Sequence, residues 1–217
     1  KYIVPRGFFL PVSPGTRFVT VGGAIASDVH GKNHHIDGSF GQNVKRILLI
    51  DGNGKLRNLK PNNSEKNNDA EKFWSTVGGM GLTGVIIEAT FKLIPITSSL
   101  IKVDTTRFKD LDHLMQEMTE ADKKYRYSVA WVDSLHKNFR GVLTCGDHLS
   151  IKDIKKDFGD DPLEYNINPI AKAPNFFPSG LLNKFSVGAF NETWFRKSPK
   201  SRVDELQNIG KFFYPLD

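Results

Sequence analysis

The spacing of apolar and polar residues predicts a β-hairpin in the first third of the chain. Residues 46–50 are rich in Ile and Leu, and residues 55–59 follow after the turn Asp51-Gly52-Asn53-Gly54. Two short runs joined by a glycine-containing turn are typical of a hairpin. A third strand is predicted over residues 85–93, which are β-branched and aromatic and are followed by Pro95.

Helices are predicted on either side of a change in pattern near Pro95. Residues 70–77 form a short helix with Asp69 as its N-cap, and residues 111–118 carry apolar side chains at helical spacing. Residues 125–133 alternate like a strand, and residues 160–200 contain several prolines and are interpreted as loop-rich. The chain is therefore expected to be α+β, with a boundary near residues 96–100.

Composition is that of an ordinary globular protein, with 39% hydrophobic and 25% charged residues. No run of 18 apolar residues is present, and the first residues lack the apolar core of a signal peptide. The single Cys145 excludes an internal disulfide and is expected to be buried. Because the chain begins with Lys1 and ends abruptly at Asp217, we expect it to be an internal fragment of a longer protein.

Residues 14–41 carry the strongest functional signal, because small residues occupy positions 22, 23, 24, 26, 27 and 31. Glycine allows the backbone to approach a ligand closely, and successive N–H groups can bind an anion such as a diphosphate. The same composition also suits a tightly packed β-bulge or helix–sheet contact. The residues alone leave these two interpretations open.

A second glycine segment matches the pattern G-x-G-x-x-G at Gly79, Gly81 and Gly84, and Asp104 lies 20 residues after Gly84. A dinucleotide-binding fingerprint requires a strand before the glycines and a helix after them. Here the predicted order is reversed, so a Rossmann site is rejected. A tight turn beside a ligand or another strand is expected instead.

Three histidines, His30, His34 and His35, raise the possibility of a metal site. Gly31 weakens any helix that would place His30 and His34 on one face, and no acid lies at a known ligand spacing. We therefore expect no metal.

Four segments, residues 19–35, 73–84, 176–184 and 194–198, resemble the vanillyl-alcohol-oxidase superfamily with its PCMH-type FAD-binding domain, and within it the decaprenylphosphoryl-ribose oxidases. The resemblance implies the second half of such an FAD domain, incomplete, over residues 1–97. An incomplete sheet-and-helix substrate domain would follow over residues 98–217.

The resemblance also implies site residues. Non-covalent FAD contacts, made mostly through the backbone, fall on Gly15, Thr20, Val21, Gly22, Gly23, Ser27, Asp28, Val29, His30 and Ile86. Lys32 and Trp131 are implied as substrate-binding residues. Ile86 and Trp131 could instead be core residues, and Lys32 a solvated surface residue. Catalytic roles fall on no residue of this chain.

The implied function is FAD-dependent oxidation of a sugar hydroxyl to a ketone, on a polyprenyl-phosphoryl pentose used for cell-envelope arabinose precursors. Alternatives are an alditol or sugar-lactone oxidase, similar to D-arabinono-1,4-lactone oxidase, and a non-catalytic basic binding module suggested by the net charge of +6. A short-chain reductase is an expected partner, nucleic acid is not, and membrane contact is at most peripheral. The location would be cytoplasmic or peripheral to the inner membrane, and the chain alone is expected to be inactive.

Overall fold

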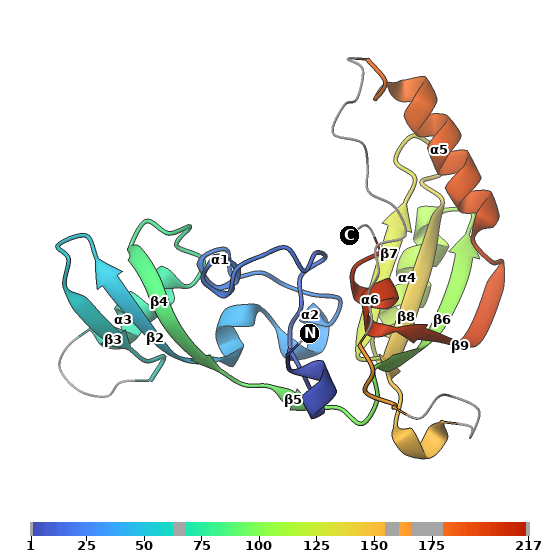
Figure 1. Ribbon diagram of the computed structural model, residues 1–217. Helices are drawn as coiled ribbons and strands as arrows, with labels where there is room; N and C mark the ends of the chain where they lie inside the picture. Colours follow the sequence, from blue (N-terminus) through green and yellow to red (C-terminus); the bar gives the residue numbers. More distant parts are fainter. Residues whose placement is uncertain (1, 63–67, 155–160, 166–179, 216–217) are drawn as a thin grey trace. The chain divides into compact units, whose positions relative to one another are not determined.

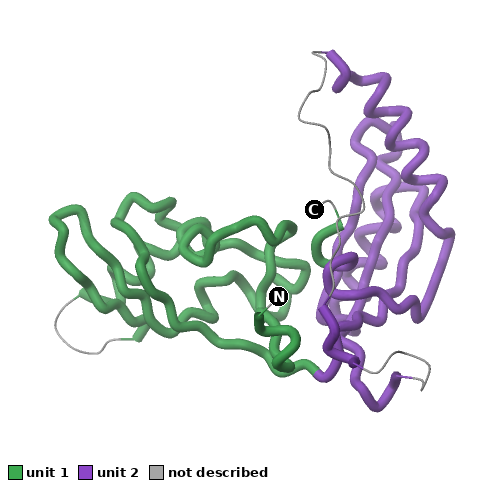
Figure 2. Tube along the Cα trace, viewed as in Figure 1, with its two compact units in different colours: residues 1–96, 213–217 green, residues 97–212 purple. Residues whose placement is uncertain are grey.

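The computed structural model describes residues 2–62, 68–154, 161–165 and 180–215. The chain divides into two compact units, the first made of residues 1–96 and 213–217 and the second of residues 97–212 (Figure 2). Both contain antiparallel sheets and helices (Figure 1), which confirms the α+β class. Within the described part of the chain, no helix combines the length and apolar character needed to cross a membrane.

The first unit is built on an antiparallel sheet with strand order β3-β2-β4. The predicted hairpin is confirmed as β2 (Val44–Asp51) and β3 (Leu56–Leu59). Asp51 holds the turn, because its Oδ1 accepts the N–H groups of Asn53 and Lys55 at 3.0 and 2.9 Å. β4 (Gly84–Phe91) pairs with the other side of β2 through a bulge at Ile87.

The predicted third strand is confirmed as β4, which ends at Phe91, two residues earlier than expected. A separate strand β5 (Ile94–Pro95) follows it and pairs with β1 (Phe8–Phe9). Proline cannot donate to a ladder, which fits its place in this short two-stranded pair.

Helices and 3-10 turns complete the first unit: η1 (Val4–Arg6), α1 (Val21–Ala26), α2 (His34–Asp37), η2 (Phe40–Asn43) and α3 (Asp69–Thr76). The predicted N-cap of α3 is wrong. Asn68, in a left-handed conformation, precedes the helix, so Asp69 lies in the first turn, where a carboxylate also suits the helix dipole. The core contains Ile25 from α1, Ile47 from β2 and Phe73 from α3, all inaccessible to solvent.

The second unit holds an antiparallel sheet of order β7-β8-β6-β9. Its strands are β6 (Leu100–Phe108), β7 (Tyr127–Val132), β8 (Gly141–His148) and β9 (Ser201–Asn208). The predicted amphipathic helix is α4 (Leu111–Ala121), which packs on one face of the sheet through Leu114. Cys145 is buried in the same cluster, as expected. η3 (Ile151–Asp153) and α6 (Ile209–Phe213) complete the element order.

The prediction that residues 160–200 are loop-rich is wrong in its last third. α5 (Lys184–Lys197) is a 14-residue helix, and no proline interrupts it. Its packing depends on polar and cation–aromatic contacts: Asn191 is buried, and Phe195 lies between the guanidinium groups of Arg107 and Arg140. Three of the prolines in this stretch, at positions 169, 174 and 178, lie outside the described residues.

Candidate functional site

The small residues at positions 22, 23, 24 and 26 form most of helix α1. Thr20 is its N-cap, and its Oγ1 accepts the N–H of Gly23 at 3.0 Å. The N–H groups of Val21 and Gly22 lie in the first turn, where a helix offers them no backbone acceptor. Thr20 and Val21 are exposed and Gly22 is half-buried, so the start of α1 lies at the surface of the first unit.

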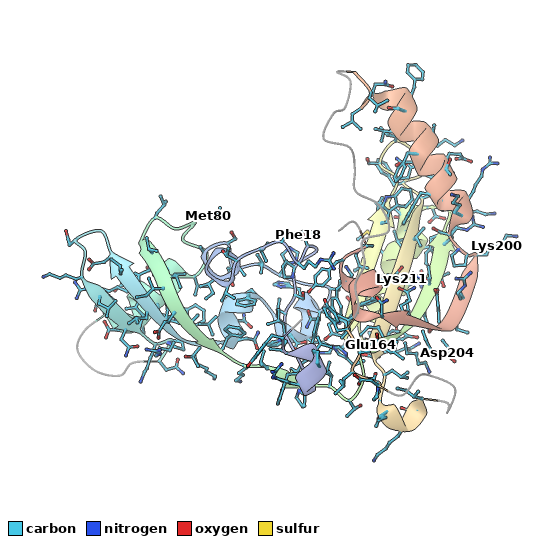
Figure 3. All side chains as sticks on the ribbon, in the orientation of Figure 1. Phe18, Met80, Glu164, Lys200, Asp204 and Lys211 are labelled. Carbon is cyan, nitrogen blue, oxygen red and sulfur yellow. The ribbon has the colours of Figure 1, made fainter. Side chains whose placement is uncertain are left out.

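The second glycine segment is bonded directly to α1. Gly78 N–H donates to the carbonyl oxygen of Ile25 at 3.0 Å, and Met80 N–H donates to that of Ala26 at 2.8 Å. α3 precedes this turn and β4 follows it, so the order of elements differs from the dinucleotide fingerprint, as the sequence predicted. Figure 3 shows Phe18 and Met80 on the same edge of the first unit as α1.

The glycines of these segments are of two kinds. A Cβ on Gly41 would lie 2.2 Å from Val77 Cγ1, and one on Gly84 would lie 2.1 Å from the carbonyl oxygen of Ile50, so the protein's own packing requires glycine there. A Cβ on Gly15 would meet nothing within 4 Å, and one on Gly22 would make only an ordinary contact of 3.7 Å. Packing therefore accounts for glycine at positions 41 and 84, and it does not account for glycine at positions 15 and 22.

The end of α1 is fixed by backbone bonds and by one carboxylate. Ser27 N–H donates to Gly23 O at 2.9 Å, and Val29 N–H donates to Ala24 O at 3.1 Å. Asp28 adopts a φ of 42°, and its Oδ1 accepts the N–H of Gly41 at 2.8 Å. The side chain of Asp28 therefore helps to hold the fold through Oδ1.

His30 forms an isolated antiparallel β-bridge with Ser39, and this bridge joins the two ends of the loop formed by residues 31–38. Its ring contacts that of His34 edge-to-face, with centroids 5.5 Å apart. Across the described ranges, no group of three or more His, Cys, Asp and Glu residues is arranged to hold a metal ion.

Lys32 lies in the loop that His30 closes, and it is half-buried. Burial lowers the pKa of its ammonium group, because a charged group is less well solvated there. The next residue, Asn33, is fully buried and donates from Nδ2 to the carbonyl oxygen of Pro11 at 2.7 Å. The backbone around Lys32 is thus anchored.

Ile86 is partly buried, packs against the core of the first unit and lies beside Gly22. A set of exposed apolar side chains, which we call the apolar rim, lies just before and at the start of α1, in the glycine turn and on β4. The sequence pattern had not singled it out. Its members are highly exposed for apolar side chains: Phe18, Val19, Val21, Met80, Leu82, Val85 and Ile87. Leu82 is 91% exposed. Apolar residues inside a glycine turn were the available signal, because turns are normally polar.

Trp131 belongs to the second unit and is half-buried on the edge strand β7. Its neighbour Ala130 packs in the cluster under α4, so alternation along the strand directs Trp131 to the other face of the sheet. Cys145 is buried, and burial raises the pKa of its thiol to about 12, which disfavours the reactive thiolate form.

The amino-acid sequence is similar to those of several known proteins. Residues 1–60 match a family model described as an FAD binding domain. Over its whole length the chain is 38% identical to decaprenylphosphoryl-beta-D-ribose oxidase of Mycolicibacterium smegmatis and covers 47% of that protein. It is 32% identical to an uncharacterized protein in the mprA 5' region of Streptomyces coelicolor, covering 60% of it. A weaker relative, 24% identical over 79% of the chain, is the delta(24)-sterol reductase homolog dhcr-24 of Caenorhabditis elegans.

The chain thus spans about half the length of the first relative and somewhat more of the second. The family match includes all of α1 and the loop that carries Lys32. The likeness to the first two relatives extends through the glycine turn and the whole second unit. Residues 1–60 thus match an FAD-binding domain, and over its whole length the chain is similar to PCMH-type FAD-binding oxidoreductases.

Proposed function

We propose that this protein oxidises a sugar hydroxyl group to a ketone, and that its substrate is a pentose attached to a polyprenyl phosphate. The observation that carries the proposal is the 38% identity, over the whole chain, to a protein named as a decaprenylphosphoryl-beta-D-ribose oxidase. Within the chain, the domain assignment proposed is an FAD-binding part over residues 1–97 and a substrate-binding part over residues 98–217.

The residues at the start of α1 fit a diphosphate-bearing cofactor. The N–H groups of Val21 and Gly22 lack helical acceptors, and a Cβ on Gly15 would meet nothing within 4 Å. FAD, when bound, supplies the redox chemistry, since it accepts the hydrogen and two electrons lost by a carbinol carbon as that carbon becomes a carbonyl. The apolar rim, represented by Met80 and Leu82, would contact the apolar parts of the bound cofactor and would thereby be shielded from water.

The remaining FAD contacts implied by the resemblance are proposed along the same segment. Gly23, Ser27, Val29 and His30 would contribute backbone atoms, as would Asp28, whose carboxylate is engaged with Gly41. Binding is proposed to be non-covalent. Acid precipitation of the holoprotein would then release all flavin into the supernatant, and flavin retained in the pellet would contradict this.

Lys32 is proposed to bind the phosphate or a hydroxyl group of the substrate. Burial lowers the pKa of its ammonium group, so an anion nearby would recover part of the lost solvation. Trp131 is proposed to line the sugar pocket with its half-buried ring. A short-chain reductase that reduces the ketone from the other face would be the expected partner.

The test compares substrates on the full-length holoprotein. Polyprenyl-phosphoryl ribose, free alditols and sugar lactones would each be added without oxygen, and bleaching of the flavin absorbance would be followed. We expect rapid bleaching with the polyprenyl-phosphoryl pentose and formation of a keto sugar detected by mass spectrometry. Bleaching by alditols or lactones alone would support the alternative oxidases, and a preparation without a flavin chromophore would support the basic binding module.

A further inference from the structure

The first turn of α5 presents an exposed apolar cluster that the proposed reaction does not use. Leu181, Leu182 and Phe185 are 46%, 83% and 88% exposed, and Lys184 lies among them. We call these four residues the α5 tip. Exposed apolar side chains that cluster together are characteristic of interaction sites, because leaving them in water is unfavourable.

The α5 tip is a rigid structure rather than a frayed helix end. The side chain of Asn183 accepts the N–H groups of Phe185 and Ser186 at 2.9 and 3.1 Å, and Ser186 Oγ accepts the N–H of Asn183 at 3.1 Å. This reciprocal capping box fixes the backbone on both sides of Lys184. Ser186 Oγ also donates to the carbonyl oxygen of Leu181. The apolar side chains therefore stay exposed although their backbone is ordered.

Leu182 has no role in stabilising the helix start. It precedes the N-cap, where an apolar residue often packs against the fourth helical residue, here Val187. Leu182 is 83% exposed, so such a contact does not bury it. Lys184 occupies the first turn, where a positive charge opposes the helix dipole. Neither residue is explained by the stability of α5.

The body of α5 is firmly held by the second unit. Arg140 contacts Glu192 at 2.5 Å, and Asn191 Nδ2 donates to Asp133 Oδ1 at 2.7 Å. Figure 1 shows that the N-terminal end of α5 extends beyond the end of the four-stranded sheet. The anchored part thus holds the α5 tip away from the rest of the unit.

Charge along α5 favours an anionic surface. Lys184, Arg196 and Lys197 are its cations, and Glu192, its acid, contacts both Arg140 and Arg196. The acid is thereby neutralised, while Lys184 remains at the exposed end. Cationic side chains beside exposed Leu and Phe are the combination that interfacial helices present to anionic lipid headgroups.

Two further aromatic residues of α5 lie outside the α5 tip. Phe190 and Trp194 are 58% and 43% exposed, and their rings stack with centroids 6.1 Å apart at an angle of 18°. They follow Phe185 by five and nine residues, so they lie on another side of a helix with about 3.6 residues per turn.

The size of the α5 tip argues against a protein partner. An aromatic side chain such as Phe185 buries roughly 150–250 Å², and the two leucines are smaller, so the three together offer less than about 750 Å². A stable protein interface needs about 800 Å² on each side. A lipid headgroup layer can surround each side chain of a projecting turn, so the same residues are sufficient for peripheral attachment.

We propose that the α5 tip inserts into the headgroup region of a membrane that contains anionic lipid, with Leu182 and Phe185 as the inserted side chains. Attachment would be peripheral. The proposal does not rest on the proposed reaction, because binding to lipid can be measured without turnover. If the substrate is a polyprenyl phosphate, this attachment would keep the second unit at the surface where such a lipid resides.

The test is co-sedimentation of the full-length holoprotein with vesicles of phosphatidylcholine, with and without phosphatidylglycerol. We expect binding to the mixed vesicles, weaker binding in high salt, and at least about tenfold weaker binding when Leu182→Ser and Phe185→Ser are combined. Lys184→Glu should weaken binding to the mixed vesicles and leave binding to phosphatidylcholine unchanged.

A matched control carries Leu56→Ser and Met115→Ser, which replace apolar residues that are each 60% exposed elsewhere. It should bind vesicles as the unmodified protein does, and thermal melting should show that both double variants fold. Equal vesicle binding by the Leu182/Phe185 variant and the control would overturn the proposal. A second outcome would also overturn it. If the unmodified protein and the control self-associate without binding vesicles, and the Leu182/Phe185 variant does not self-associate, the α5 tip is a protein interface.

Discussion

The N–H of Met80 donates a 2.8 Å hydrogen bond to the carbonyl oxygen of Ala26, and this bond joins the two glycine segments of the chain. Ala26 ends α1, whereas Met80 lies in the turn between α3 and β4 with a φ of 51°. The two segments therefore form one surface, with backbone donors at its start and the apolar rim around it. The first predictions concern this surface.

Gly22→Val should remove flavin while leaving the fold intact. The new side chain begins 3.7 Å from Ile86 Cβ, an ordinary contact, so the protein has room for its Cβ. Its methyl groups would widen the gap between α1 and Ile86 and displace the backbone N–H groups that we propose for FAD. We expect the flavin-to-protein ratio of the purified holoprotein to fall about tenfold or more, the effect of losing one charge-assisted hydrogen bond. Absorbance at the flavin band measures it.

Gly41→Val is the matched control. Its Cβ would lie 2.2 Å from Val77 Cγ1, so it should destabilise the first unit by about 1–3 kcal/mol or more through overpacking. Gly23→Val is a poorer test, since its Cβ would lie 3.0 Å from Thr20 Oγ1 and would disturb the N-cap itself. Full flavin retention by Gly22→Val would contradict a close backbone approach.

Asp28→Ala should destabilise the protein more than Asp28→Asn does. The aspartate accepts the N–H of Gly41 at 2.8 Å and adopts a left-handed φ of 42°. Alanine loses the bond and is disfavoured in that conformation, at a combined cost of about 2–4 kcal/mol, whereas asparagine can keep both. Urea denaturation of the three proteins checks this. Equal midpoints for the two variants would mean that the bond contributes little.

Lys32→Ala should weaken substrate use about tenfold or more in kcat/KM, since a charge-assisted hydrogen bond contributes about 1.5–3 kcal/mol. Flavin content should stay unchanged. Wild-type kinetics in this variant would mean that Lys32 has no part in substrate binding.

A second measurement on Lys32 needs no substrate. Burial lowers the pKa of its ammonium group below the ordinary value of 10.5, so the charged form is less favourable in the folded state than in the unfolded state. The resulting destabilisation is present at neutral pH and disappears as pH rises above 10.5. Lys32→Met should therefore raise the free energy of unfolding at pH 7, and a decrease would contradict this.

Asp133→Asn should destabilise the second unit and change its acid unfolding. Burial acts to raise the pKa of Asp133, but hydrogen bonds from Asn191 and Arg140 outweigh it, and the pKa lies below its ordinary value of 3.8. A lowered folded-state pKa stabilises the fold above pH 3.8, and this contribution is lost as pH falls through the folded-state pKa.

The expected loss at neutral pH is about 3 kcal/mol, because Asp133 is 2% exposed and a buried ion pair is broken. The variant should also show a shallower loss of stability in acid. Denaturation at a series of pH values measures both effects. Asp112→Asn, an exposed change in the first turn of α4, serves as the control and should match the unmodified protein.

The sequence by itself determined the elements whose signals are local. The hairpin around Asp51, the helix α4 and the strand β7 follow from turn chemistry and from periodic apolar positions, because each of these depends on residues close in the chain. The order of elements around Gly79 was also sufficient to reject a Rossmann site.

Only the tertiary structure decided which glycines serve packing. A Cβ on Gly41 or Gly84 would clash with atoms of distant residues, whereas one on Gly22 would make an ordinary contact with Ile86 and one on Gly15 would meet nothing within 4 Å. This difference depends on contacts that no local pattern contains. Helix α5 escaped prediction for the same reason. It is held by the hydrogen bond from Asn191 to Asp133 and by contacts of the Phe195 ring with two arginines. Its buried side therefore lacks the apolar stripe by which a sequence reveals a helix. The partners that stabilise α5 come from parts of the chain that are distant in sequence.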